Sequence, residues 1–142
     1  MNVSARNVFK GKISALVDGA VNAEVEVTLP GGDKIVAIVT EGSVKSLGLA
    51  VGKEAVAYVK APWVMLLVGP QAAKFSARNQ LTGKVSVLHK GAVNTEVGIT
   101  LAGGTVVYAV VTNEAVMELG LKEGVEASAL IKASHVILGV SG

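Results

Sequence analysis

The chain repeats itself at an offset of 72 residues, from Ser4 to Ser76, and the two copies align without a gap. The segment Ser-Ala-Arg-Asn at residues 4–7 recurs at 76–79, and Gly-Ala-Val-Asn at 19–22 recurs at 91–94. A chain whose halves match along their whole length is built from two copies of one small unit. We therefore expect two domains, at residues 1–70 and 73–142, joined by a linker at 69–73 that contains Gly-Pro.

Each half reads as short strands with one short helix. Apolar and polar residues alternate over 21–29, turn residues fill 30–33, and 34–39 follows as a hairpin partner. Thr40 is placed to cap a helix through Leu47, and Gly48 to end it. Apolar runs at 55–60 and 64–68 predict two strands that close each unit. The pattern predicts an all-β fold of two tandem, OB-like, five-stranded Greek-key barrels, each with one short helix.

Composition excludes several classes of protein. The absence of cysteine removes disulfides, thiolate nucleophiles and zinc fingers. The apolar runs fall far short of the ~20 residues of a membrane span, and the first residues lack a signal pattern, so we expect a cytoplasmic protein. A net charge of +2 and few aromatic residues argue against nucleic-acid binding. With only His89 and His135, and no nucleophile beside a base, we do not expect an enzyme.

The candidate functional residues are polar groups that recur in both copies, and all of them are hydrogen-bond donors. They are Ser4, Arg6, Asn7, Asn22 and Lys60, with their copies Ser76, Arg78, Asn79, Asn94 and Lys132. A set of donors with few acceptors suits a small oxyanion and suits a metal cation poorly. The small residues before each repeated asparagine, at 19–21 and 91–93, can converge backbone N–H groups on an anion.

A structural interpretation stays open beside the functional one. The Ser-Ala-Arg-Asn segment can be the start of a strand whose arginine pairs with a surface carboxylate. The Gly-Ala-Val-Asn segment can be a turn whose glycine takes a positive φ. His89 and His135 are not repeated, so each is expected to be a surface or packing residue rather than a ligand. Trp63 is expected to belong to the core or to an interface.

Taken together, these motifs resemble the Mop, or molbindin, family of cytoplasmic molybdate-binding proteins. The resemblance rests on Ser-Ala-Arg-Asn, Gly-Ala-Val-Asn-x-Glu-Val, a helix that ends in Leu-Gly-Leu, and Lys-Ala-x-x-Val-x-Leu, each present twice. It covers nearly the whole chain and implies a tandem-domain member. It further implies OB-type barrels, a homotrimer with six Mop domains, and molybdate or tungstate bound at interfaces between domains.

The resemblance also implies two classes of site. The first class is implied at Ser4, Ala5, Arg6, Asn7, Lys60, Ala61 and Pro62, and at Ser76, Ala77, Arg78, Asn79, Lys132, Ala133 and Ser134. The second is implied at Gly19, Ala20, Val21 and Asn22, and at Gly91, Ala92, Val93 and Asn94. Ser134 offers donors that Pro62 lacks, so the two copies should differ in affinity. The expected function is molybdenum storage and homeostasis. The alternative is a molybdate-sensing module that acts on a separate transporter or transcription factor.

Overall fold

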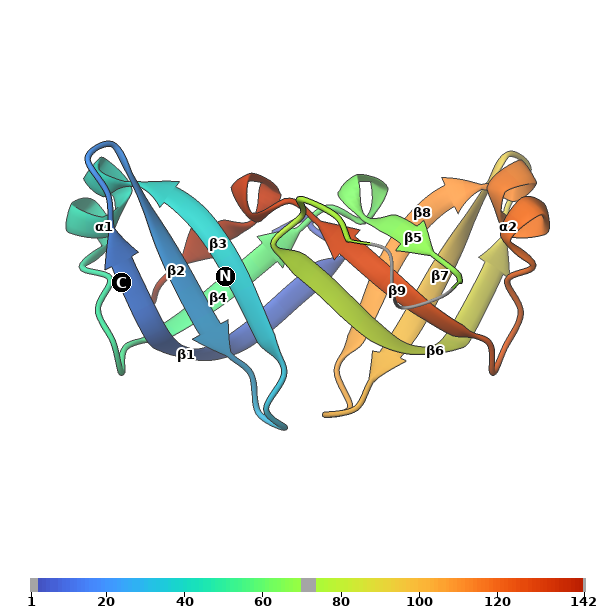
Figure 1. Ribbon diagram of the computed structural model, residues 1–142, viewed down its shortest axis with the longest axis horizontal. Helices are drawn as coiled ribbons and strands as arrows, with labels where there is room; N and C mark the ends of the chain where they lie inside the picture. The colour runs from blue at the N-terminus through green and yellow to red at the C-terminus, as the bar shows by residue number, and fades with distance from the viewer. Residues whose placement is uncertain (1–2, 70–73, 142) are drawn as a thin grey trace.

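Two curled five-stranded antiparallel sheets stand side by side in the computed structural model, which describes residues 3–69 and 74–141 (Figure 1). The first half contains β1 (Asn7–Asp18), β2 (Asn22–Thr28), β3 (Lys34–Thr40), α1 (Glu41–Leu47), β4 (Glu54–Val59), a 3₁₀ turn (Ala61–Trp63) and β5 (Met65–Leu67). The second contains β6 (Asn79–Lys90), β7 (Asn94–Leu101), β8 (Val106–Thr112), α2 (Asn113–Leu119), β9 (Glu126–Ile131), a 3₁₀ turn (Ala133–His135) and β10 (Ile137–Gly139). The predicted order of strands and helix is confirmed in both halves. Beyond Gly69, the expected linker lies outside the described residues.

The predicted helix ends are confirmed. The Thr40 hydroxyl accepts a hydrogen bond from the Ser43 N–H at 3.1 Å, which satisfies a donor that the first turn leaves free. Gly48 ends α1 in the left-handed conformation, with φ at 65°, where a residue without Cβ has no steric penalty. Thr112 and Gly120 play the same roles for α2. In Figure 1 the two helices lie at the outer ends of the molecule.

The expectation that each half closes its own barrel with its last strand is wrong. The sheet orders are β10-β4-β1-β2-β3 and β5-β9-β6-β7-β8, so the halves exchange β5 and β10. Ile137 pairs with Tyr58, and Met65 pairs with Leu130. Because β4 and β9 are copies of one sequence, either offers a suitable edge to either closing strand. Alternation within a strand identifies a strand but not its partner.

The hydrophobic core runs through both halves. One cluster of buried side chains includes Ile13 and Val25 from the first half and Val85 and Val97 from the second. All four are at most 2% exposed. Burial of this apolar surface stabilises the two sheets together, since the exchanged strands carry core residues such as Leu138 across the boundary.

Equivalent positions of the two halves touch each other along the middle of the molecule. The Trp63 and His135 rings, from matching 3₁₀ turns, lie 5.2 Å apart between centroids. On the opposite side the β2–β3 and β7–β8 turns meet, and the Gly103 N–H donates to Asp33 Oδ2 at 3.1 Å. A Cβ on Gly31 would lie 2.4 Å from the Gly103 carbonyl oxygen, so this approach requires glycine. Contact between matching positions places the halves around an approximate twofold axis.

Candidate functional site

Strand pairing brings the predicted Ser-Ala-Arg-Asn and Lys-Ala segments together in both halves. Asn7 pairs with Val59 at the last rung between β1 and β4, so the chain before Asn7 leaves the sheet beside Lys60. Asn79 and Ile131 form the matching last rung between β6 and β9. Ser4, Lys60 and Pro62 are exposed, as are Ser76, Lys132 and Ser134, whereas Ala61 and Ala133 are buried. Each half therefore presents a cluster of hydroxyl, guanidinium and ammonium donors at one end of its sheet.

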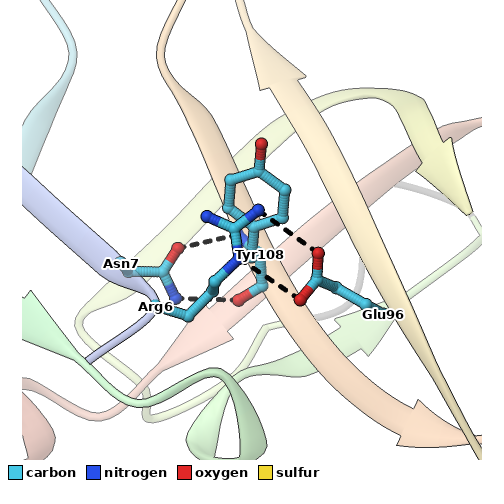
Figure 2. Close-up of polar contacts among 4 residues, drawn as sticks. All are labelled: Arg6, Asn7, Glu96 and Tyr108. Carbon is cyan, nitrogen blue, oxygen red and sulfur yellow. Dashed lines mark hydrogen bonds and ion pairs between the residues drawn. The ribbon is translucent and has the colours of Figure 1, made fainter. Parts of the chain in front are cut away.

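Both arginines are ion-paired across the two halves. Arg6 donates to the Glu96 carboxylate from Nε at 3.2 Å and from Nη2 at 3.3 Å (Figure 2). Arg78 Nη2 donates to the Glu24 carboxylate. The hydrogen bond with its glutamate is the largest of the effects that raise the pKa of each arginine. The structural interpretation of this segment, in which the arginine pairs with a carboxylate, is thus confirmed.

The arginine of the first half has a second support. The Arg6 guanidinium carbon lies 3.6 Å from the centroid of the Tyr108 ring, in cation–π geometry (Figure 2). The residue that matches Tyr108 in the other half is Val36, which has no ring to offer Arg78. The two clusters share their charged residues but hold their arginines differently.

The asparagines of the repeated segment are internal connectors between the sheets. Asn7 is 1% exposed; its Nδ2 donates to the Tyr108 carbonyl at 2.8 Å, and its Oδ1 accepts from the Tyr108 N–H at 2.7 Å. Asn79 is 2% exposed and makes the same pair of bonds with Val36, at 2.8 and 2.7 Å. Each carboxamide takes the place of a neighbouring strand on the edge of β8 or β3. Both amides were predicted to donate hydrogen bonds to a ligand, and in the structure both bind backbone groups of the protein.

The Gly-Ala-Val-Asn segments lie at the other ends of β1 and β6 and are not brought to the arginine clusters within one chain. Each forms an exposed hairpin turn, closed by a Gly19 N–H to Asn22 carbonyl bond of 2.9 Å and its copy at Gly91. Neither glycine has a positive φ, so that part of the structural interpretation is wrong. A Cβ would instead lie 2.5 Å from the Asn22 oxygen at the first turn, and close approach is the reason for glycine.

A shallow hollow of about 320 Å³ lies beside the first of these turns. Its lining residues are Val17, Asp18, Gly19, Asn22, Ala23, Glu24 and Ile38. A hydrogen bond with Asp18, burial, and repulsion from Asp18 together raise the pKa of Glu41 nearby. A larger hollow of about 670 Å³, over β4 and β1, is lined by lysines including Lys10 and contains none of the predicted residues. Its position away from the repeated donors makes it the weaker candidate.

Sequence reasoning did not single out Glu24, Glu96 or Tyr108. The repetition of Glu24 as Glu96 was a usable signal, because both belong to the repeated Glu-Val pair. Tyr108 left no such signal, since Val36 occupies the matching position. Within residues 3–69 and 74–141, no group of three or more histidine, cysteine or acidic side chains could hold a metal ion. None of the helices described there is long and apolar enough to cross a membrane.

The fold and the site define a tandem protein of OB-like units, joined by exchanged strands, with a donor-rich cluster in each half. The TOBE domain family matches residues 3–66 and again residues 76–138, and the chain belongs to this family.

Similar proteins support this assignment along the whole chain. The solved, molybdate-bound structure of the cytoplasmic molybdate-binding protein ModG is 60% identical, with a TM-score of 0.94, and the match covers 99% of this chain and 100% of that one. The molybdenum-pterin-binding protein MopA of Rhodobacter capsulatus is 44% identical over 99% of this chain and 53% of its own length. The molybdenum transport protein ModE of Azotobacter vinelandii is 45% identical over 100% of this chain and 52% of its own length. The chain thus spans about half the length of these two curated relatives.

Proposed function

We propose that this protein binds molybdate, and also tungstate, reversibly and serves in molybdenum storage and homeostasis. The observation that carries the proposal is the twofold meeting of the Ser-Ala-Arg-Asn and Lys-Ala segments, each at the last rung of a strand pair. The 60% identical ModG structure, which is described with molybdate bound, supports the choice of ligand.

The chemistry of the clusters suits a tetrahedral dianion. Each cluster has a lysine and an arginine whose charge is partly offset by its paired glutamate, and the serine hydroxyl adds a neutral donor. Hydrogen bonds between charged donors and oxyanions are short and about twice as strong as neutral ones. Sulfate has the same charge and shape but is smaller, so selection against it would depend on the size of the cavity. Closure of the site by a second surface would exclude water and strengthen each contact.

We further propose that the protein assembles as a homotrimer with six domains, so that sites are completed between copies. Several large apolar side chains lie exposed near the donor clusters and on the exchanged strands. Met65 on β5 is 64% exposed and Ile137 on β10 is 57% exposed, while Trp63, at the end of the 3₁₀ turn before β5, is 40% exposed. β5 and β10 are edge strands, and a second copy that covers them would prevent other chains from pairing with these edges. Molybdate bound between copies would stabilise this assembly by mass action.

The role we propose is binding rather than catalysis, and storage rather than sensing. The sensing alternative gains support from the longer relatives, of which this chain spans about half. Two measurements on cells that lack the protein and are then deprived of molybdate distinguish storage from sensing. Loss of a store shortens the time for which molybdenum enzymes stay active, whereas loss of a sensor changes the expression or activity of the molybdate transporter.

Calorimetric titration of the anion-free protein with molybdate tests the proposal, with sulfate as the control ligand and native mass measured on the same sample. We expect saturable molybdate binding by a trimer. Lys132→Ala should weaken binding at least about tenfold, because a charge-assisted hydrogen bond contributes ~1.5–3 kcal/mol. Lys122→Ala, at an exposed lysine after α2, makes the same charge change away from the cluster and should bind as the wild type does. A folded, anion-free protein that produces no heat with molybdate would refute the proposed function.

A further inference from the structure

The two arginines of the donor clusters are oriented before any ligand arrives. Glu96, on β7, contacts the Arg6 side chain through both carboxylate oxygens. Glu24, on β2, accepts a hydrogen bond from Arg78 Nη2 of the other half through one carboxylate oxygen. A long, flexible side chain that is already held loses less conformational freedom when it binds a ligand. The glutamates therefore raise the affinity for the anion by lowering the entropy cost of binding, without contacting the anion themselves.

The glutamates leave donors free on the arginines. A guanidinium carries five N–H groups in a fixed planar fork. Glu96 takes one donor from Nε and one from Nη2 of Arg6, which leaves both donors of Nη1 and one of Nη2. In Figure 2 the guanidinium nitrogen that has no dashed line points away from Glu96. The free edge has the two-nitrogen geometry that matches a pair of oxyanion oxygens.

The supports of the two arginines differ in number. Glu96 holds Arg6 at one edge, and the Tyr108 ring covers one of its faces at 3.6 Å. Tyr108 is itself anchored, because Asn7 binds both its N–H and its carbonyl. For Arg78, the matching residue Val36 is bound by Asn79 in the same way but supplies no ring. Arg78 therefore depends on Glu24 more strongly than Arg6 depends on Glu96.

We propose that Glu24 and Glu96 are positioning residues for the oxyanion-binding arginines, and that Tyr108 is a second positioning residue that only the Arg6 site possesses. This inference rests on the proposed function, since it assumes that both arginines contact the anion. The inference predicts that the two sites depend unequally on their glutamates: loss of Glu24 weakens anion binding at the Arg78 site, whereas loss of Glu96 leaves binding at the Arg6 site largely intact.

The test is calorimetric titration with molybdate of protein in which one cluster has been silenced by a lysine substitution. With Lys60→Ala as the background, Glu24→Ala should weaken the remaining Arg78 site threefold to tenfold, the effect of freeing one side chain. With Lys132→Ala as the background, Glu96→Ala should weaken the Arg6 site less than twofold. Glu24→Gln keeps one acceptor oxygen and should give an intermediate loss.

Two further variants separate positioning from a general effect on folding or charge. Val36→Tyr, introduced beside Glu24→Ala, should restore affinity by supplying the missing ring. Glu54→Ala removes an exposed carboxylate at the start of β4, the end of that strand away from Lys60, and it should leave affinity unchanged. Thermal melts of every variant without anion verify that the fold is intact, since exposed ion pairs contribute little to stability.

The outcomes distinguish this inference from the function on which it rests. Wild-type protein that takes up no molybdate overturns both. Wild-type protein that binds molybdate, with Glu24→Ala and Glu96→Ala equally affected, overturns the inference alone. Stronger binding in the glutamate variants also overturns it, because the carboxylates would then compete with the anion rather than prepare its site.

Discussion

Replacement of Asn79 by alanine tests how much one buried carboxamide contributes to holding the two sheets together. The Asn79 amide joins β6 to the edge of β3 in the other sheet through the N–H and carbonyl of Val36. It also donates to the Ile131 carbonyl on β9 at 3.2 Å. Alanine removes all three hydrogen bonds and leaves the polar groups of Val36 without this partner.

The expected cost follows from the count of bonds. At about 1 kcal/mol for each hydrogen bond, Asn79→Ala should lower the free energy of unfolding by about 3 kcal/mol. Asn7→Ala, which loses two hydrogen bonds to the Tyr108 backbone, should cost about 2 kcal/mol. For a chain of this length, about 3 °C per kcal/mol places the fall in Tm near 9 °C and 6 °C. Such a loss is a large part of a typical domain stability of ~5–15 kcal/mol.

Urea unfolding of the anion-free protein, at one fixed protein concentration, measures these values. Gln80→Ala provides the control, because Gln80 is the next residue of β6 and its side chain is exposed. The control should change the free energy of unfolding by less than about 0.5 kcal/mol. If Asn79→Ala costs no more than the control, the carboxamide does not hold the sheets together and the reasoning is refuted.

Three further outcomes are expected. Gly31→Ala should destabilise more than Gly32→Ala in thermal melts, because both glycines have a φ near 100° but only Gly31 meets the facing turn within 4 Å; equal effects would contradict this. A chain of residues 1–69 lacks β10 and should not fold as a monomer, so light scattering should find it unfolded or associated; a folded monomer would show that β5 can close its own half and that strand exchange is not required. Because Asp18 raises the pKa of Glu41, the folded state binds the Glu41 carboxyl proton more tightly than the unfolded state does. This proton binding stabilises the fold at low pH, and the stabilisation is lost as the pH rises through the folded-state pKa. Glu41→Gln should therefore stabilise the protein at neutral pH and have no effect well below pH 4.5, whereas the same gain at both pH values would show that repulsion is not its cause.

Local structure and the choice of candidate residues were readable from the chain alone. Alternation over 21–29 identified β2, because a strand with one buried face repeats every two residues. Thr40 and Gly48 set the ends of α1 through capping, which acts within a few residues. Repetition of Lys60 and its neighbours marked the donor clusters, since the same residues appear twice at one offset.

The sequence by itself determined the two units, their strands and helices, and the set of donors at each cluster, because periodicity, capping and repetition act over short distances along the chain. Only the tertiary structure decided which half each closing strand joins, since two edges at matching positions of the repeat compete for it. It also decided that the Asn79 carboxamide binds the edge of β3, and that Arg6 meets Glu96 and Tyr108. Arg6 and Glu96, for example, are 90 positions apart in the chain, and no local sequence pattern specifies a contact over that separation.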